Sequence, residues 1–320
     1  MLDKKECNYL DTARFIGMYL VVFGHVALIY EYRFISYMIY SFHMPLFFMI
    51  SGILHKQQRA EKKNILKTIY SLLIPFMLYN VLCFLYLFVE RGEAVFEGLE
   101  DILLGLRVVS GASWFIWVLF WIKFLSLFLR SKAIYVILSL VFLGGILLIK
   151  YFCPSLKNYY LFQSVLFSFP FFTVGYCLRD KLEYPMKKYM KCLFIVIGVV
   201  LCYLTTEYVG SISVVKAAYS NLFVNCVVAV MVSVSLVFFS QLVTPYVKYP
   251  FVRDVSRGTM IIVGLHSFIM YQVFPDIFFG PKALRVALLL SVVLFLAFYP
   301  IIKMTYNTMP ILYGKRKGTT

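Results

Sequence analysis

The sequence predicts an all-α, polytopic membrane protein with about ten transmembrane helices and both termini in the cytoplasm. Three observations support this fold class. The chain of 320 residues is 62% hydrophobic and only 14% charged, whereas a soluble domain of this size is about half apolar and a quarter charged. Apolar runs long enough to cross the hydrocarbon core recur along the whole chain. Lysine and arginine are also distributed unevenly between the segments that join these runs.

The predicted spans begin and end where apolar runs meet charged or turn-forming residues. They are Asp11–Tyr30, Ile35–Leu54, Thr68–Val89, Ser113–Leu129, Ala133–Ile149, Tyr160–Leu178, Cys192–Thr205, Ala217–Val243, Thr259–Phe279 and Ala283–Ile302, of which the fourth and seventh are the shortest. No polar cleavage region follows the first run, so we interpret it as a spanning helix and not as a removable signal peptide. We expect residues 1–320 to form one transmembrane domain with no separate soluble domain.

The net charge of +16 is explained by membrane topology. If the N-terminus lies inside and the spans alternate, most of the 31 lysines and arginines fall in inward segments, above all 56–67 and 179–191. This asymmetry follows the positive-inside rule. We therefore predict the lipid bilayer as the partner of the basic segments and no nucleic-acid partner.

The first span carries three ionisable residues on one stripe. His25 follows Arg14 by eleven positions, which returns it to within about 20° of Arg14 and about 16 Å further along a helix. A charge near the bilayer centre costs about 2.5–3.5 kcal/mol on insertion scales, so the stripe is a candidate site. Asp11 either pairs with Arg14 at i,i+3 or caps the helix N-terminus, and we favour the cap.

The second span reads Phe-His-Met-Pro-Leu-Phe-Phe-Met-Ile-Ser-Gly over residues 42–52. His43 is expected at a depth similar to that of His25, because the loop between the two spans is short. Pro45 removes a backbone donor and should kink the helix. Ser51 and Gly52 permit close helix approach or an opening near the inner end. This pattern predicts a cavity beside the charged stripe; the alternative is an ordinary proline kink with an interfacial histidine.

Two tryptophans open the fourth span at the outer face. Tryptophan at a membrane interface usually belongs to an aromatic belt, which is our interpretation of Trp117. For Trp114 a sugar-binding platform is the more specific alternative.

Taken together, these motifs resemble acyltransferase family 3 membrane proteins, most closely their fucose 4-O-acetylase-like branch. The matching pieces are Arg14 to His25, Phe42 to Gly52, Trp114 to Phe120, Phe171 to Gly175, and Leu265-His266. Two departures stand out. The branch often has Asp-x-x-Lys-Gly where this chain has Asp11-Thr-Ala-Arg14-Phe. Near the ninth span, Arg257-Gly-Thr-Met replaces a usual Ser-Tyr-Ser, and this weakens the inference that His266 has a role in the site.

The resemblance implies an enzyme of the bacterial cytoplasmic membrane. It would transfer an acetyl group from cytoplasmic acetyl-CoA to a sugar hydroxyl in a surface polysaccharide of the cell envelope or in its lipid-linked precursor. His25 would be catalytic and Arg14 would bind the donor, since arginine offers a fixed cationic fork for phosphates. The supporting residues would be Asp11, His43, Ser51, Trp114 and His266. Acetyl-CoA is a substrate here, and we expect no permanently bound cofactor and no metal.

Two mechanisms suit His25. A neutral imidazole can take the proton of the sugar hydroxyl, or it can form an acyl-histidine intermediate. A transporter or flippase for a glycolipid or small solute is the main alternative function, because intramembrane charges also mark substrate paths. Against it, the ionisable residues crowd into the first two spans with no counterpart in the second half. A scaffold for a glycan-assembly complex is the third interpretation.

Overall fold

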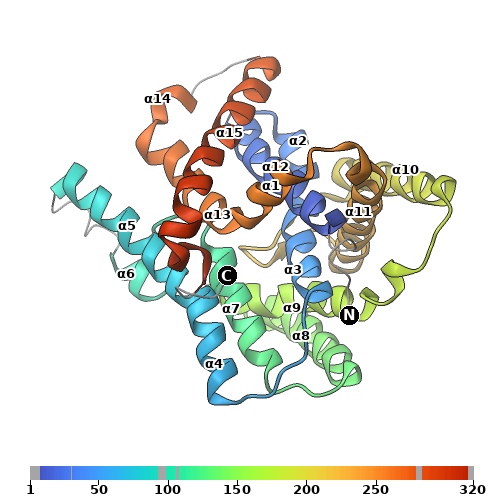
Figure 1. The fold of residues 1–320 in the computed structure, drawn as a ribbon. Coiled ribbons are helices and arrows are strands. Elements are labelled where there is room, and N and C mark those ends of the chain that lie inside the picture. Colours follow the sequence, from blue (N-terminus) through green and yellow to red (C-terminus); the bar gives the residue numbers. More distant parts are fainter. Residues whose placement is uncertain (1–7, 30, 93–98, 106–107, 279–282, 316–320) are drawn as a thin grey trace.

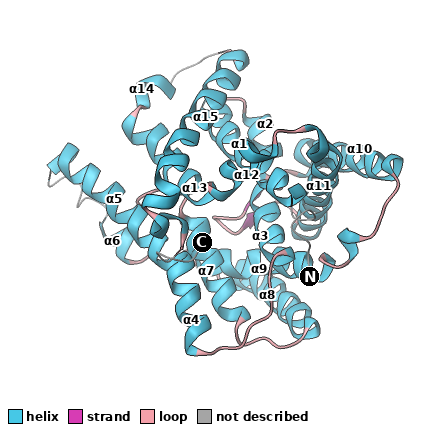
Figure 2. Cartoon of the chain, viewed as in Figure 1, coloured by secondary structure: helices cyan, strands magenta, loops and turns pink. Residues whose placement is uncertain are grey.

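The computed structural model describes residues 8–29, 31–92, 99–105, 108–278 and 283–315, and these are almost entirely helical (Figures 1 and 2). Within them, eight helical segments are long and apolar enough to cross a membrane. These are Tyr9–Leu28, Arg33–Ile53, Lys62–Arg91, Lys132–Phe152, Tyr159–Leu178, Lys188–Val209, Leu222–Tyr246 and Leu284–Thr308; the shorter apolar helices Trp114–Ser126 and Thr259–Val273 join them. The protein is an all-α, multi-pass membrane protein, as predicted.

Several spans consist of more than one helix. In chain order the elements are α1 (Asn8–Ile29), α2 (Arg33–Tyr40), α3 (His43–Ile53), α4 (Lys62–Thr68), η1 (Ile69–Leu73), α5 (Ile74–Arg91), α6 (Leu99–Leu103), α7 (Trp114–Ser126), α8 (Lys132–Phe152), η3 (Tyr159–Leu161), α9 (Phe162–Leu178), η4 (Lys181–Glu183), α10 (Lys188–Leu204), η5 (Thr205–Val209), β1 (Ile212–Ser213), β2 (Ala218–Tyr219), α11 (Leu222–Val243), η6 (Thr244–Tyr246), α12 (Tyr249–Arg257), α13 (Thr259–Phe268), η7 (Ile269–Val273), α14 (Pro275–Phe278), α15 (Leu284–Thr308) and η8 (Pro310–Tyr313).

Each predicted span coincides with one of these segments, but their lengths differ. The seventh span is not short: it covers Lys188–Val209, because the lysines at its start continue the helix. The ninth span is short instead, because the helix after Thr259 ends at Val273. The predicted end residues Tyr30 and Phe279 lie outside the described residues.

The second span is broken at the residues before its proline. α2 ends at Tyr40 and α3 begins at His43, and between them Phe42 has the non-helical dihedrals φ −137° and ψ −20°. Pro45 has no N–H to bond the carbonyl four residues earlier, and its ring would clash with that carbonyl. The predicted kink is therefore present, and it is sharp enough to separate the span into two helices.

The predicted close approach at Ser51 and Gly52 is also present, and α9 is the partner. A Cβ atom added to Gly52 would clash with the backbone oxygen of Phe172, and one added to Gly175 would clash with that of Met49. Two glycines thus let the backbones of α3 and α9 touch, as small residues do in membrane helix pairs. This contact fixes the kinked second span against the sixth.

α1 lies at the centre of the bundle (Figure 1). It packs against α2, α3, α11, α12, α13 and α15, and its residues Ala13, Val22 and Ala27 are fully buried. A two-stranded antiparallel hairpin, β1–β2, lies between α10 and α11 and is coloured magenta in Figure 2. Its residues Ile212 and Val214 are buried, so this outer loop folds back into the helix bundle.

Candidate active site

Three histidines line one cavity near the outer ends of the spans, which we call the histidine cavity. His25 comes from α1, His43 from the first turn of α3 and His266 from α13. The cavity has an empty volume of about 640 Å³, and its other lining residues are Val21, Tyr40, Met44, Phe47, Ala112, Trp114, Phe115, Ile212, Ser213, Val214, Val215 and Val263. No acidic residue, lysine or arginine is among them. Imidazoles within apolar walls are typical of acid–base sites from which bulk water is excluded.

Tyr40 connects two of the histidines. Its hydroxyl lies 3.2 Å from Nδ1 of His25, and its ring centroid lies 5.1 Å from that of His43. Tyr40 is the last residue of α2, so the break before His43 places it beside the imidazole of the first span. The structure therefore brings His25 and His43 together as the depth argument predicted, with a phenol between them.

Backbone carbonyls orient the other two imidazoles. Nδ1 of His43 lies 2.9 Å from the carbonyl oxygen of Ile39, and Nδ1 of His266 lies 2.6 Å from that of Ile262. A carbonyl oxygen only accepts, so both Nδ1 atoms must carry the proton and donate. In the neutral state, Nε2 of each ring then holds the lone pair.

His266 faces His25 directly. Their ring centroids are 5.2 Å apart with the planes at 60°. His266 is fully buried, and its Nε2 has no hydrogen-bond partner among the described residues. A buried polar atom without a partner is unusual and points to a ligand or water at that position. His266 thus lies inside the site, although its neighbouring residues depart from the family pattern and argue against a role for it.

This position also corrects the argument used against a transporter. The second half of the chain does contribute an ionisable residue, because α13 packs beside α1 and carries His266 into the cavity. The sequence does not show this proximity, because His266 follows His25 by 241 positions.

The outer wall of the histidine cavity consists of Trp114 and the β1–β2 hairpin. Trp114 is half-buried and lines the cavity, together with Ile212 to Val215 of the hairpin. Trp117 lies elsewhere: its Nε1 donates to the carbonyl oxygen of Tyr160 at 2.9 Å, which ties two outer segments together. The two tryptophans therefore differ in surroundings, and only Trp114 is placed to contact a ligand beside His25.

A second cavity, which we call the arginine cavity, adjoins the first nearer to the N-terminal end of α1. It has an empty volume of about 950 Å³. Arg14, Arg257 and Lys315 supply three cationic side chains to its lining, and no acidic residue is among the lining residues. Its walls share Phe47, Phe115 and Val263 with the histidine cavity. Arg14 and His25 thus line neighbouring cavities that have these apolar side chains in common.

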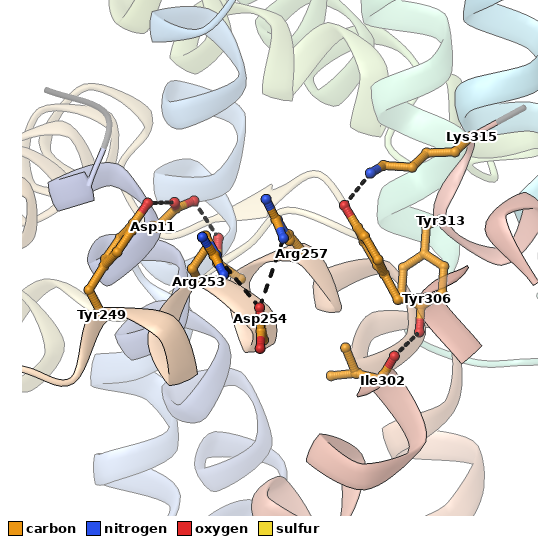
Figure 3. Close-up of polar contacts among 10 residues, drawn as sticks. Asp11, Tyr249, Arg253, Asp254, Arg257, Ile302, Tyr306, Tyr313 and Lys315 are labelled. Atoms are coloured by element: carbon orange, nitrogen blue, oxygen red, sulfur yellow. Dashed lines mark hydrogen bonds and ion pairs between the residues drawn. The ribbon is translucent and has the colours of Figure 1, made fainter. Parts of the chain in front are cut away.

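Asp11 corrects one sequence prediction. It does not cap α1, because the helix begins at Asn8, earlier than the apolar run suggested. Instead its carboxylate accepts a hydrogen bond of 2.8 Å from the hydroxyl of Tyr249 on α12 (Figure 3). It accepts a second one of 2.8 Å from the hydroxyl of Ser256, and it lies 3.6 Å from Arg14. The predicted pairing of Asp11 with Arg14 at i,i+3 is present. Burial, and then Asp11, raise the pKa of Tyr249 to about 12, so this phenol remains a donor.

The other two cations of the arginine cavity surround Tyr306 of α15 (Figure 3). The guanidinium carbon of Arg257 lies 5.5 Å from the centroid of its ring. Nζ of Lys315 lies 4.1 Å from the same centroid and donates to the Tyr306 hydroxyl. Arg257 also lies 3.9 Å from Asp254, which is outside the cavity lining. The cationic groups are thus held in place by one aromatic ring while their charge still faces the cavity.

Ser51 lines the arginine cavity, and its carbonyl oxygen accepts a hydrogen bond of 3.0 Å from Nζ of Lys123. Sequence reasoning singled out Ser51 but missed Lys123, Tyr40, Arg257 and Lys315. One signal was available: a lysine within the apolar helix α7 is as unusual as Arg14 in the first span. The other three acquire their positions only through tertiary packing.

A model of acyltransferase family 3, described as an acyltransferase domain, matches residues 8–313, which is nearly the whole chain. No curated protein and no solved structure matches the chain significantly.

Proposed function

The chain belongs to acyltransferase family 3 and is a membrane acyltransferase, and we propose that it moves an acetyl group from cytoplasmic acetyl-CoA to a sugar hydroxyl. The acceptor would be a surface polysaccharide or its lipid-linked precursor, and the enzyme would lie in the bacterial cytoplasmic membrane. Membership of the fucose 4-O-acetylase-like branch remains a prediction.

One observation carries the proposal: cationic side chains and imidazoles line two adjoining cavities at opposite depths of the same helix bundle. Acetyl-CoA has the same asymmetry, with phosphates at one end and a thioester at the other. Arg14 and Arg257 suit the phosphates, because guanidinium groups bind them with fixed fork geometry. The thin pantetheine arm would pass Phe47, Phe115 and Val263 and bring the thioester to His25.

In the histidine cavity, His25 would act as the general base. With Nδ1–H donating to the Tyr40 oxygen, its Nε2 holds the lone pair that takes the proton of the sugar hydroxyl. The sugar oxygen forms the new bond to the acetyl carbonyl carbon, the carbon–sulfur bond breaks, and the imidazolium returns its proton to the leaving thiolate. The products are an O-acetyl sugar and CoA. An acyl-His25 intermediate would reach the same products in two steps.

Trp114 would hold the acceptor. It lies on the outer wall of the same cavity as His25, and the flat apolar face of an indole suits a sugar ring. Ser213 of the hairpin supplies a hydroxyl on the same wall. This arrangement would let a sugar approach from the outer side while the donor arrives from the inner side.

Mass spectrometry of surface glycans tests the proposal. Three kinds of cell are compared: cells with the protein, cells without it, and cells with only the His25→Ala variant. We expect an acetyl group on a defined sugar in the first kind alone, with the variant present in the membrane at normal level on immunoblots. Normal acetylation in cells carrying His25→Ala would overturn the assignment of His25.

A matched experiment addresses the alternative of a transporter or flippase. Purified protein in liposomes is given a labelled glycolipid without acyl-CoA. We expect no movement of the label across the bilayer above that of empty liposomes. Movement that needs no acyl-CoA, together with glycans that lack acetyl groups, would favour the transporter over the acyltransferase proposed here.

A further inference from the structure

A third cavity, the lysine cavity, continues from the arginine cavity toward the cytoplasmic loops. It has an empty volume of about 800 Å³. It shares Ser71, Leu72 and Leu119 with the arginine cavity, so the two adjoin in the same way as the arginine and histidine cavities. The three cavities therefore follow one another, with the arginine cavity between the lysine cavity and the histidine cavity.

The lysine cavity has cationic side chains and no acidic ones. Lys56, Lys67 and Lys123 are among its lining residues, and neither aspartate nor glutamate is. Lys56 is an exposed residue of the loop after α3, and Lys67 is an exposed residue near the end of α4. Lys123 is half-buried and projects from the apolar helix α7.

Lys123 has polar and aromatic neighbours but no counter-ion. Its Nζ donates to the Ser51 carbonyl at 3.0 Å and lies 4.8 Å from the ring centroid of Phe172. No carboxylate lies within 4 Å of it in the part of the chain that the structure describes. A carbonyl and a ring face compensate a desolvated ammonium only in part. An anion bound in the cavity would complete the compensation.

A further positive group reinforces this field. Arg179 donates to the backbone oxygen of His55, a buried lining residue of the same cavity. Burial, and then the charges of Lys123 and Arg179, lower the pKa of His55 to about 3. His55 is therefore neutral, and the cationic groups among the lining residues are the three lysines.

We propose that the lysine cavity binds the 3′-phosphate of CoA, with Lys123 as its central ligand, while Arg14, Arg257 and Lys315 bind the diphosphate. This assignment rests on the proposed function and deepens it. CoA carries its phosphates in two groups, a diphosphate next to the pantetheine arm and a separate phosphate on the ribose. The protein likewise has two cationic clusters in adjoining cavities, and the arginine cavity is the one that adjoins the histidine cavity. Lysine, a compact point charge with three donors, suits a terminal phosphate.

Direct binding of CoA to the purified full chain in nanodiscs tests this inference without an acceptor or any turnover. Isothermal titration compares CoA with 3′-dephospho-CoA for the wild type, Lys123→Met and Lys123→Arg. The matched control is Lys132→Met, because Lys132 is an exposed lysine that pairs with Asp180 and is not among the lining residues of the lysine cavity.

We expect the wild type and Lys132→Met to bind CoA about tenfold more tightly than 3′-dephospho-CoA, as the loss of a charged hydrogen bond implies. Lys123→Met should bind the two ligands about equally, and Lys123→Arg should recover part of the preference. If Lys123→Met does not fold, the double variant Lys56→Met/Lys67→Met should reduce the same preference. An unchanged preference in the folded variants would overturn the inference.

The outcome is separable from that of the proposed function. Binding of CoA that depends on Lys123 in a protein that acetylates no glycan would reject the sugar acetylation alone. Glycan acetylation by a protein whose Lys123→Met variant keeps the full preference for CoA would reject the phosphate assignment alone.

Discussion

The histidine cavity and the arginine cavity occupy the same helix bundle but differ in the charge of the side chains that line them. The first is lined by imidazoles, a phenol and apolar side chains, and no lining residue has a permanent charge. The second is lined by Arg14, Arg257 and Lys315. Bond making needs groups that exchange protons in a dry site, whereas holding phosphates needs fixed positive charge. In the function proposed above, chemistry and donor binding would therefore be separated between the two cavities.

This separation has a kinetic consequence. A side chain that acts only in the transition state changes kcat, and one that binds ground and transition states equally changes KM. Substitutions in the two cavities should therefore affect different constants. The following experiments are ordered from the largest expected effect to the smallest.

His25→Ala should produce the largest loss. Removal of a positioned general base typically lowers the rate by about 10²–10⁴-fold. We expect a decrease of that size in kcat for acetyl transfer by purified membranes, with the KM for acetyl-CoA changed by less than about threefold. A variant whose defect lies entirely in the KM for the donor would contradict the separation of the two cavities.

Arg14→Met should have the opposite pattern. Loss of a charged hydrogen bond to a phosphate should raise the KM for acetyl-CoA about 10–100-fold, while kcat at saturating donor stays close to that of the wild type. The same assay with varied acetyl-CoA gives both constants, and Lys132→Met again serves as the control for loss of an inner cation. If Arg14→Met lowers kcat with an unchanged KM, Arg14 takes part in chemistry and the comparison fails.

Gly52→Ala should lower the stability of the contact between α3 and α9, and α3 supplies lining residues to both cavities. Its methyl group would clash with the Phe172 backbone oxygen, and rigid backbones at the α3–α9 contact leave little room to adjust. Overpacking of this kind costs about 1–3 kcal/mol. Gly144→Ala is the matched control, because an added Cβ at Gly144 in α8 meets nothing within 4 Å. Thermal unfolding in detergent should show a lower midpoint for Gly52→Ala alone, and equal midpoints would mean that the contact is not as tight as described.

Tyr249→Phe should have the smallest effect. It removes one hydrogen bond to Asp11, worth about 1 kcal/mol, and loosens Arg14 without touching the histidine cavity. Because the pKa of Tyr249 is raised to about 12 in the folded protein, its stabilisation is complete below pH 10 and is lost between pH 10 and 12 as the unfolded chain ionises first. Thermal midpoints of wild type and variant should therefore differ at pH 8 and converge above pH 10. A gap that widens with pH would contradict this role.

The sequence predicts the features that depend on local geometry. The positions of the predicted spans follow from length and hydropathy, and each coincides with a long or a shorter apolar helix of the described residues. The shared stripe of Arg14 and His25 follows from the helical repeat, and the break near Pro45 follows from its missing N–H. Each of these arguments involves residues on one segment or on two adjacent ones.

Features that depend on packing between distant spans were not predictable in this way. His266 reaches His25 only because α13 packs against α1, and the hairpin around Ile212 enters the bundle although it belongs to a loop. The preference for Asp11 as a helix cap was wrong because its partners, Tyr249 and Ser256, lie on α12, which packs against the start of α1. Tyr40 lies beside His25 because the second span breaks after Tyr40. Pro45 predicts a break in this span but does not predict the residue at which it occurs.

The central claim is that the donor enters through the cationic cavities and reacts at His25. Sealed membrane vesicles test it most directly, because they carry their own glycan acceptor and acetyl-CoA does not cross the bilayer. Labelled acetyl-CoA is added to inside-out and right-side-out vesicles from cells that make the protein or its His25→Ala variant. We predict label in the glycan fraction of inside-out, wild-type vesicles only. Equal labelling of right-side-out vesicles, or labelling by His25→Ala, would contradict the account.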